Sequence, residues 1–171
     1  ATTTGGCNVA VGNCSLLINT TGCRNSVLGE GTMRCNTTGK DNVAVGRQTL
    51  FNNTTADNNV GVGYQALVSN TTGTKNVAMG TSALAGNTTG NSSIAIGYRA
   101  MQVSTTAEAN VVIGEEAGDA LTTGNHNTAV GHQSLSGNTT GACNTAIGCG
   151  ALLSNTTGAS NTAVGAGALG A

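Results

Sequence analysis

A 17-residue repeat runs through this chain and constrains its fold more than any other feature. One glycine recurs every 17 residues without an insertion. We number the repeat positions 1–17 with Asn8 at position 1, so that Asn-(Val/Thr)-Ala-(Val/Ile)-Gly fills positions 1–5 and Asn-Thr-Thr-Gly fills positions 12–15. The glycines of position 5 are Gly12, Gly29, Gly46, Gly63, Gly80, Gly97, Gly114, Gly131, Gly148 and Gly165. Such a short period excludes paired-helix repeats, which need more than about 30 residues.

The period and the composition together predict an all-β fold, a parallel β-solenoid. Asn, Thr and Gly are poor helix formers, whereas short identical strands stack on their copies at about 4.8 Å. We expect one domain over residues 1–171, with a partial coil at 1–7. Coils 1 to 10 then start at residues 8, 25, 42, 59, 76, 93, 110, 127, 144 and 161. Two short strands and two glycine turns per coil would build a rod about 48 Å long.

Alternation along the two expected strands predicts which positions face the core. In the first strand, positions 2 and 4 would point inward. In the second, positions 9, 11 and 13 would point inward and positions 8, 10, 12 and 14 outward. All six basic and seven acidic residues, both histidines and the three aromatic residues fall at positions 6, 7, 10, 16 and 17. Since charged groups are rarely buried, these five positions should face solvent.

Asparagine at position 1 and glycine at positions 5 and 15 predict structural ladders along the stack. Position 1 is Asn in nine coils, with Ser93 as the exception, and stacked amides would bond the coils above and below. This ladder includes Asn8, Asn42, Asn59, Asn76, Asn110, Asn127, Asn144 and Asn161. The glycines indicate turns with a positive φ, which Gly adopts without steric cost.

Six cysteines stand outside the consensus of the repeat. Cys7 and Cys23 are one coil apart with an offset of one residue, which places their Cα atoms about 6 Å apart and within reach of a disulfide. Small apolar packing residues are the alternative interpretation, and both stay open. The remaining four, Cys14, Cys35, Cys143 and Cys149, have no equally well placed partner.

Seven Asn-Thr-Thr triplets match the acceptor sequence for N-glycosylation. With position 12 facing outward, they would carry sugar in a host that secretes the chain through the endoplasmic reticulum. The candidate acceptors are Asn19, Asn36, Asn53, Asn70, Asn87, Asn138 and Asn155.

The sequence offers little for catalysis or for metal binding. Glu108, Glu115, Glu116 and Asp119 cluster in two coils that depart from the consensus. They are a weak candidate for Ca²⁺, which needs converging oxygens, and a solvated irregular coil is the preferred reading. No Ser-His-Asp set or phosphate loop is present, so we expect neither an enzyme nor a cofactor. A net charge of −1 gives no footprint for nucleic acid, and no apolar run is long enough to span a membrane.

The motifs NVAVG at 42–46 and SIAIG at 93–97 resemble the head repeats of YadA-like trimeric autotransporter adhesins. The unit NTAVGHQSLSGNTTG is also similar to repeats of phage tail fibres and of surface proteins that precede an endosialidase-type chaperone domain. The resemblance covers essentially the whole chain. It implies an extracellular, fibrous and oligomeric structural element, located on a cell or virion surface, with β-rolls packed side by side as trimers.

We therefore expect a structural component of an extracellular fibre whose partners are copies of itself, packed head to tail or side by side. Neither end of the sequence shows a polar cap, which favours end-to-end stacking or a longer chain. Two alternatives remain. The threonines of positions 13 and 14 would suit an ice-binding surface, and Tyr64 and Tyr98 with their neighbours would suit a glycan-binding face that recognises a host-surface glycan or protein.

Overall fold

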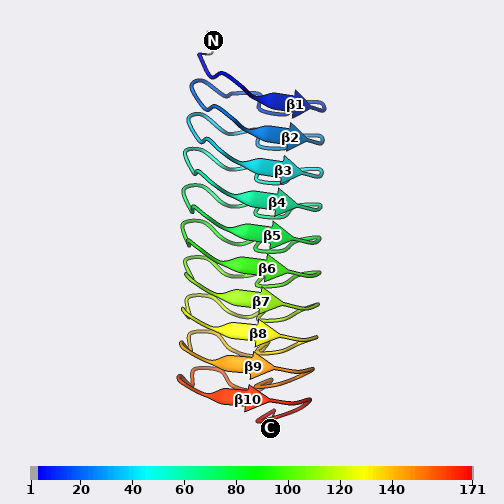
Figure 1. Ribbon diagram of the computed structural model, residues 1–171, viewed down its shortest axis with the longest axis vertical. Helices are drawn as coiled ribbons and strands as arrows, with labels where there is room; N and C mark the ends of the chain where they lie inside the picture. Colours follow the sequence, from blue (N-terminus) through cyan, green and yellow to red (C-terminus); the bar gives the residue numbers. More distant parts are fainter. Residues whose placement is uncertain (1–3, 171) are drawn as a thin grey trace.

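The computed structural model describes residues 4–170, and over this range the chain is a parallel β-solenoid, as expected (Figure 1). Residues 1–3 of the expected partial coil and Ala171 lie outside the described residues. Ten three-residue strands form one sheet in sequence order, and each of the first nine pairs in parallel with the strand 17 residues later. The strands are β1 (Val9–Val11), β2 (Ser26–Leu28), β3 (Val43–Val45), β4 (Val60–Val62), β5 (Val77–Met79), β6 (Ile94–Ile96), β7 (Val111–Ile113), β8 (Thr128–Val130), β9 (Thr145–Ile147) and β10 (Thr162–Val164).

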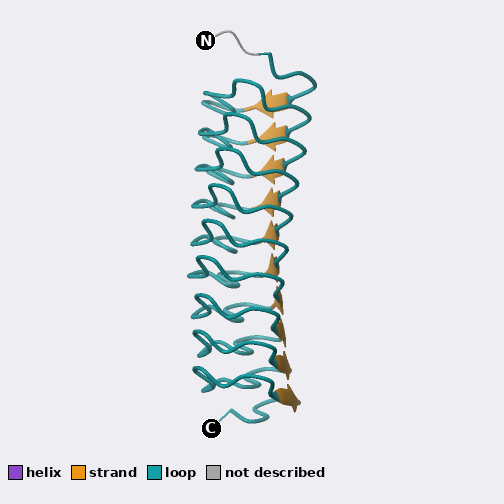
Figure 2. Ribbon diagram, turned by 90° about the vertical axis from the view of Figure 1, so that its left-hand side faces the viewer, coloured by secondary structure: helices purple, strands orange, loops and turns teal. Residues whose placement is uncertain are grey.

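Only one of the two strands expected in each coil forms within residues 4–170, the one at positions 2–4. The sheet lies on one side of the rod and irregular turns lie opposite (Figure 2). The expectation of a second strand was wrong because positions 7, 9 and 17 adopt left-handed backbone, as at Gln65 (φ 56°), Leu67 (φ 53°) and Lys75 (φ 61°), which extended strands exclude. The turns still bond coil to coil, for example from Leu67 N to Ala83 O at 3.0 Å.

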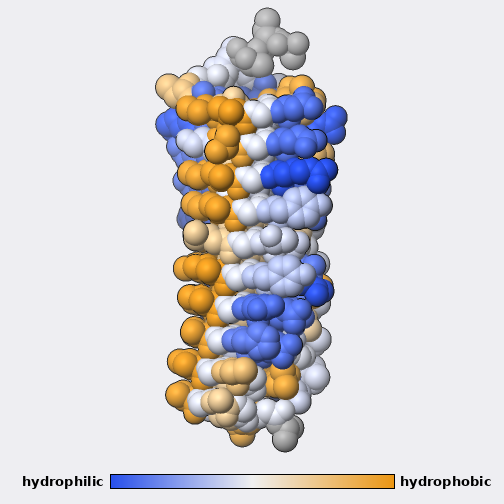
Figure 3. Space-filling model, turned by 90° about the vertical axis from the view of Figure 1, so that its right-hand side faces the viewer, coloured by the Kyte–Doolittle hydropathy of each residue, from blue (hydrophilic) through white to orange (hydrophobic). Residues whose placement is uncertain are grey.

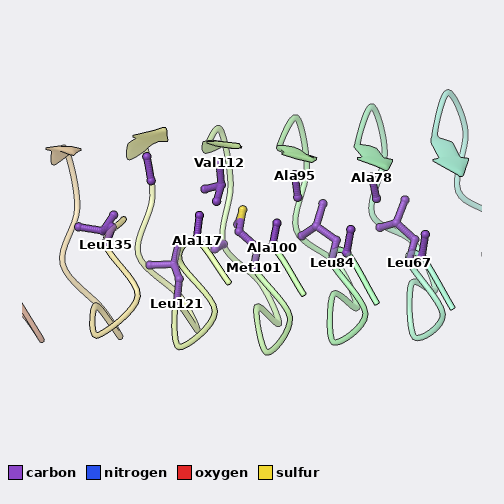
Figure 4. Packing of buried hydrophobic residues seen from close by; sticks show 14 of the residues in the cluster. Leu67, Ala78, Leu84, Ala95, Ala100, Met101, Val112, Ala117, Leu121 and Leu135 are labelled. Carbon is purple, nitrogen blue, oxygen red and sulfur yellow. The ribbon is translucent and has the colours of Figure 1, made fainter. Parts of the chain in front are cut away.

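The sheet faces the opposite way from the expected one. Position 3 points inward and is fully buried at Ala44 and Ala78, whereas positions 2 and 4 point outward, with Val43 39 % and Met79 41 % exposed. The reason is the narrow interior, in which leucines from the opposite wall reach the sheet (Figure 4). A Cβ built on Gly61, at position 3, would lie 2.6 Å from Thr49 Cγ2. Where leucine fills position 9, position 3 is never larger than alanine, and valine occupies position 3 only at Val27, in the coil of Met33, and at Val112, in the coil of Gly118.

The inward and outward positions predicted for the second strand are partly confirmed and partly wrong. Position 9 is buried as predicted, as at Leu67, and positions 10 and 14 are at least partly exposed. Positions 8 and 12 were expected outside but are buried, as at Ala66 and Asn70. Position 11 was expected inside, yet Val103 is 44 % exposed. Irregular backbone has no period of two, so strand alternation does not apply there.

Two asparagine ladders hold the interior together, and the one at position 1 was predicted. Asn59 Nδ2 donates to Gly73 O at 2.8 Å, and Asn59 Oδ1 accepts from Asn76 N at 3.0 Å. At position 12, Asn70 Nδ2 donates to the same Gly73 O at 2.9 Å and to Asn53 Oδ1 of the preceding coil at 3.1 Å. The carbonyl group of position 15 therefore accepts both amides of its coil. Buried polar groups of this kind cost little when every one is paired.

The two glycine positions have different causes. Position 5 has φ between 125° and 145°, as predicted, which excludes other residues. No glycine of position 15 in the described coils has a positive φ, so that expectation was wrong. Position 15 is instead crowded: a Cβ on Gly73 would lie 2.5 Å from Asn70 Oδ1. Ala56 and Ala107 show that this crowding can be accommodated.

Candidate functional site

The outer face of the sheet is an uncharged surface that runs through all ten coils. It consists of positions 2 and 4 of β1 to β10, and its members are Val, Ile, Leu or Met except for Ser26, Thr128, Thr145 and Thr162. All of these residues lie within the described range, and none is charged. Figure 3 shows the apolar column of position 4 running the length of the rod beside the column of position 6, which is polar from Asn13 to His132. We call this surface the outer sheet face.

The dimensions of the outer sheet face follow from strand geometry. Nine steps between ten strands give a length of about 43 Å, and two side-chain columns give a width of about 10 Å. The resulting area of about 400 Å² lies within the range of about 300–600 Å² found for the largest apolar patches of ordinary monomers, which are often functional. Several members are widely open to solvent, including Val11 (55 %), Leu28 (51 %) and Val164 (68 %). Such a continuous, uncharged strip is typical of a surface that becomes covered.

The threonine columns differ in their chemistry. The hydroxyls of position 13 donate to the carbonyl group of the next coil, as from Thr54 Oγ1 to Thr71 O at 3.0 Å. The threonines of position 14 are exposed, as at Thr72 and Thr89. One threonine per coil therefore faces solvent and one is partly buried or bonded to the backbone, which agrees with the expected division.

Charged residues lie at the solvent-facing positions, as predicted, and pair between neighbouring coils. Within residues 4–170 the ion pairs are Arg24–Asp41 at 2.6 Å, Arg47–Glu30 at 3.3 Å and Arg99–Glu116 at 3.3 Å. The hydrogen bond from Arg24 lowers the pKa of the Asp41 carboxyl below its ordinary value. Each pair joins the same position of adjacent coils, so the variable columns reinforce the 17-residue register.

The predicted glycosylation sites are wrong for the buried asparagines. Asn19, Asn36, Asn53, Asn70, Asn87 and Asn138 are all buried. Asn155 is half-buried, and its amide donates to Gly158 O at 3.0 Å. Modification requires an accessible amide nitrogen, whereas these amides are committed to the position 12 ladder or to the position 15 carbonyl group.

The predicted disulfide between Cys7 and Cys23 is also wrong: all six cysteines, each within the described range, carry free thiols. The coils stack position on position, so Cys7 lies over Arg24, whose N–H donates to Gly6 O at 3.2 Å. Cys23 contacts the Arg24 guanidinium at 3.3 Å. Because the two cysteines are offset by one residue at a bend, their thiols lie in different surroundings.

The acidic cluster does not form a metal site. Among residues 4–170 no group of three or more metal-ligating side chains converges. Glu116 pairs with Arg99 and accepts from Gln133 at 3.1 Å, and Glu108 accepts from Asn91 at 2.8 Å. Burial, with Glu116 as the second cause, raises the pKa of the Asp119 carboxyl. The Glu108 and Glu116 carboxylates thus serve separate contacts between coils.

The two tyrosines of the expected glycan face stand apart. Tyr64 and Tyr98 occupy position 6 two coils apart, with Thr81 between them. Each ring has its own arginine, with Arg47 at 5.6 Å from the centroid of Tyr64 and Arg99 at 5.9 Å from that of Tyr98. The structure brings neither ring into a shared site with the other.

Sequence reasoning missed the outer sheet face, although a signal was present. Position 3 is mostly Ala, flanked by the larger residues of positions 2 and 4. A column of small side chains between two columns of larger ones indicates close contact on the side of the small ones. We assigned the larger residues to the core on hydrophobicity alone.

Comparison with known proteins finds no family model, curated protein or solved structure that matches the chain. A search of the described residues for a helix long and apolar enough to cross a membrane finds none.

Proposed function

We propose that this chain is a structural element of a fibre outside a cell or virus particle, in which copies pack side by side through the outer sheet face. The observation that carries the proposal is the uncharged apolar strip along all ten strands. Burying such a surface against a second copy removes apolar area from water, at about 25 cal/mol per Å². The resemblance to adhesin and tail-fibre repeats supports the extracellular setting.

Self-association fits the geometry of the strip better than binding to an unrelated partner. A standard interface buries about 800 Å² per partner, about twice the area of the strip, so the flanking columns must contribute. Those columns repeat every 17 residues, as the strip does. A second copy with the same repeat matches this spacing over the whole length, which a globular partner cannot.

Sedimentation velocity on paired variants tests this proposal. Val77→Lys with Ile94→Lys places two charges on the outer sheet face, and we expect the wild-type oligomer to become a monomer. Thr89→Lys with Thr106→Lys places the same charges on the exposed threonine column of the same two coils, and this control should stay oligomeric. Circular dichroism establishes that both variants are folded.

Two outcomes contradict the proposal. One is a wild-type chain that sediments as a monomer at every concentration up to its solubility limit. The other is dissociation of the control to the same extent as the outer-face variant, which would place the interface elsewhere.

Ice binding through the threonines is the weaker second function. The exposed column of position 14 is regular, but the hydroxyls of position 13 are used by the backbone. A thermal hysteresis that Thr89→Tyr abolishes, in a wild-type chain that remains monomeric, would favour ice binding over fibre assembly.

A further inference from the structure

A hollow of about 260 Å³ opens on the surface over coils 1 to 3, at positions 6, 7 and 10. Its floor is Gly31, a buried residue at position 7, where the next two coils carry Gln48 and Gln65. Gly31 has φ 63°, close to the 57° of Gln48 and the 56° of Gln65. The backbone is therefore the same as in those coils, and the hollow exists because one side chain is missing.

Phe51 and Arg34 form one wall of this hollow. The Arg34 guanidinium lies 5.6 Å from the centroid of the Phe51 ring. The chain has four arginines, all in its described part, and the other three, Arg24, Arg47 and Arg99, each pair with a carboxylate. Arg34 is the one without such a partner, so its fork of donors is free to bind an anion.

The rest of the lining is Asn13, Cys14, Glu30 and Gln48, and its one carboxylate, Glu30, pairs with an arginine outside the hollow. Glu30 pairs with Arg47 at 3.3 Å, which leaves Arg34 as the uncompensated charge. The side-chain oxygen Gln48 Oε1 accepts from Gln65 Nε2 at 3.1 Å, so the side-chain NH₂ of Gln48 can donate to a ligand. Asn13 lies at the rim and adds a second amide.

We propose that this hollow binds a single sugar ring that carries a carboxylate, such as a hexuronic acid unit of an acidic polysaccharide. The C–H face of the sugar packs on the edge of Phe51 that faces Gly31, the carboxylate takes a charge-assisted pair of hydrogen bonds from Arg34, and the hydroxyls bond to Gln48 and Asn13. The volume lies just below the range of about 300–1,000 Å³ typical of sites for drug-sized ligands, which suits one ring. This inference does not rest on the proposed assembly, since none of the lining residues belongs to the outer sheet face, although Asn13 and Glu30 lie in the position 6 column that flanks it.

Saturation-transfer difference NMR with methyl β-D-glucuronide as the probe tests the site, and it works whether or not the chain assembles. We expect weak binding of the glucuronide, weaker binding of methyl β-D-glucoside and no saturation of acetate. Gly31→Gln restores the side chain of the next coil, whose Cβ would sit 3.4 Å from the Phe51 ring, and should weaken binding by about tenfold or more. Arg34→Gln should weaken the glucuronide by a similar factor and leave it no tighter than the glucoside.

Matched controls separate the hollow from general effects. Gly150→Gln makes the same change at position 7 of coil 9, where the backbone has φ 64° and the space is open, and Arg24→Gln removes an arginine that is already paired. Both should bind as the wild type does. Unchanged binding by Gly31→Gln, equal loss in Gly150→Gln, or saturation of acetate equal to that of the glucuronide would each overturn the proposal, the last by reducing the site to a nonspecific anion contact.

Discussion

Coils 5 and 7 enclose the same cross-section of the solenoid with different side chains. In coil 5, Ala78, Leu84 and Asn87 fill positions 3, 9 and 12, and all three are buried. In coil 7 the same positions hold Val112, Gly118 and Leu121, also buried. A Cβ on Gly118 would lie 3.5 Å from Val112 Cγ1, so the larger Val112 occupies space that Gly118 leaves open. Leu121 adds the large apolar side chain that position 9 lacks (Figure 4).

The coil before coil 7 interrupts the position 12 ladder and leaves polar atoms unpaired. The position 12 ladder runs from Asn19 to Asn87, and it stops where coil 6 has Ser104. Among buried side-chain polar atoms of residues 4–170, only Asn87 Oδ1 and Ser104 Oγ lack a hydrogen-bond partner. The position 1 ladder survives the same coil, because Ser93 Oγ accepts from Asn110 N at 3.3 Å. The substitutions of coil 7 thus keep the interior of that coil filled, whereas one polar ladder is interrupted.

The largest expected effect comes from removing the large apolar side chain in the core of coil 7. Leu121→Ala should lower the free energy of unfolding by about 2–5 kcal/mol, because it removes the one large apolar side chain that replaces both Leu and Asn of the consensus. Leu84→Ala in coil 5 is the matched variant and should cost a similar amount. Chemical denaturation followed by circular dichroism measures both.

A second variant makes the same comparison sharper. Leu121→Asn together with Gly118→Leu and Val112→Ala rebuilds the coil 5 arrangement in coil 7, and it should recover most of the stability that Leu121→Asn alone loses. A Leu121→Ala variant as stable as the wild type would show that Leu121 does not take over the role of position 9.

The next effect concerns the ladder that survives. Asn59→Ala leaves Asn76 N without its side-chain partner and Gly73 O with the Asn70 amide alone, and it should cost about 1–3 kcal/mol in thermal or denaturant unfolding. Asn59→Ser copies the residue found naturally in coil 6 and should cost clearly less, since Ser Oγ can still accept from the next coil. Equal losses for Ala and Ser would mean that the side-chain acceptor is unimportant.

Repairing the interrupted ladder should stabilise the molecule. Ser104→Asn gives Asn87 Oδ1 a donor, and we expect a gain of about 1 kcal/mol. Asn53 above Ala56 shows that Asn fits a coil with alanine at position 15, with Nδ2 to Ala56 O at 3.2 Å. Ser104→Ala, which removes the unpaired hydroxyl but adds no donor, is the control and should change stability less. A loss of stability in Ser104→Asn would mean that coil 6 lacks room for the amide.

The smallest effect is electrostatic and depends on pH. Burial raises the pKa of Asp119, so the folded state favours the protonated carboxyl, and stability present below the ordinary value of 3.8 is lost as the pH rises through the folded pKa. Asp119→Asn should therefore raise the melting temperature at pH 7. The gain in the free energy of unfolding should be less than about 1 kcal/mol, because this group is partly exposed. The gain should vanish in acid.

Asp41→Asn provides a control of opposite sign. The pKa of Asp41 is lowered by Arg24, so its contribution is present above the ordinary carboxyl value and is lost as the pH falls through the folded pKa. This variant should be less stable than the wild type at pH 7. A uniform shift of both variants in the same direction would contradict these two assignments.

Much of the architecture could be predicted from the spacing of a few residues. The constant 17-residue spacing of the glycines from Gly12 to Gly165 predicted the coil. Leu at position 9 was correctly predicted to lie in the core. Asn at position 1 was correctly expected to bond between coils. The candidate surfaces were predicted less well, because the same apolar pattern at positions 2 to 4 fits either side of a strand. Asn70 looked like an outward acceptor because nothing in its triplet reveals that Gly73 O lies within reach.

The sequence by itself determined the period, the parallel stacking and the columns open to solvent, because each identical residue in a 17-residue repeat must stack on its copies and charges must avoid the interior. Only the tertiary structure decided which side of the sheet is the core. That choice depends on the distance between the walls. Where leucine fills position 9, position 3 has room for alanine, as at Ala44 and Ala78, and no valine stands there. The excluded valines and isoleucines were thereby placed outside, where they form the outer sheet face.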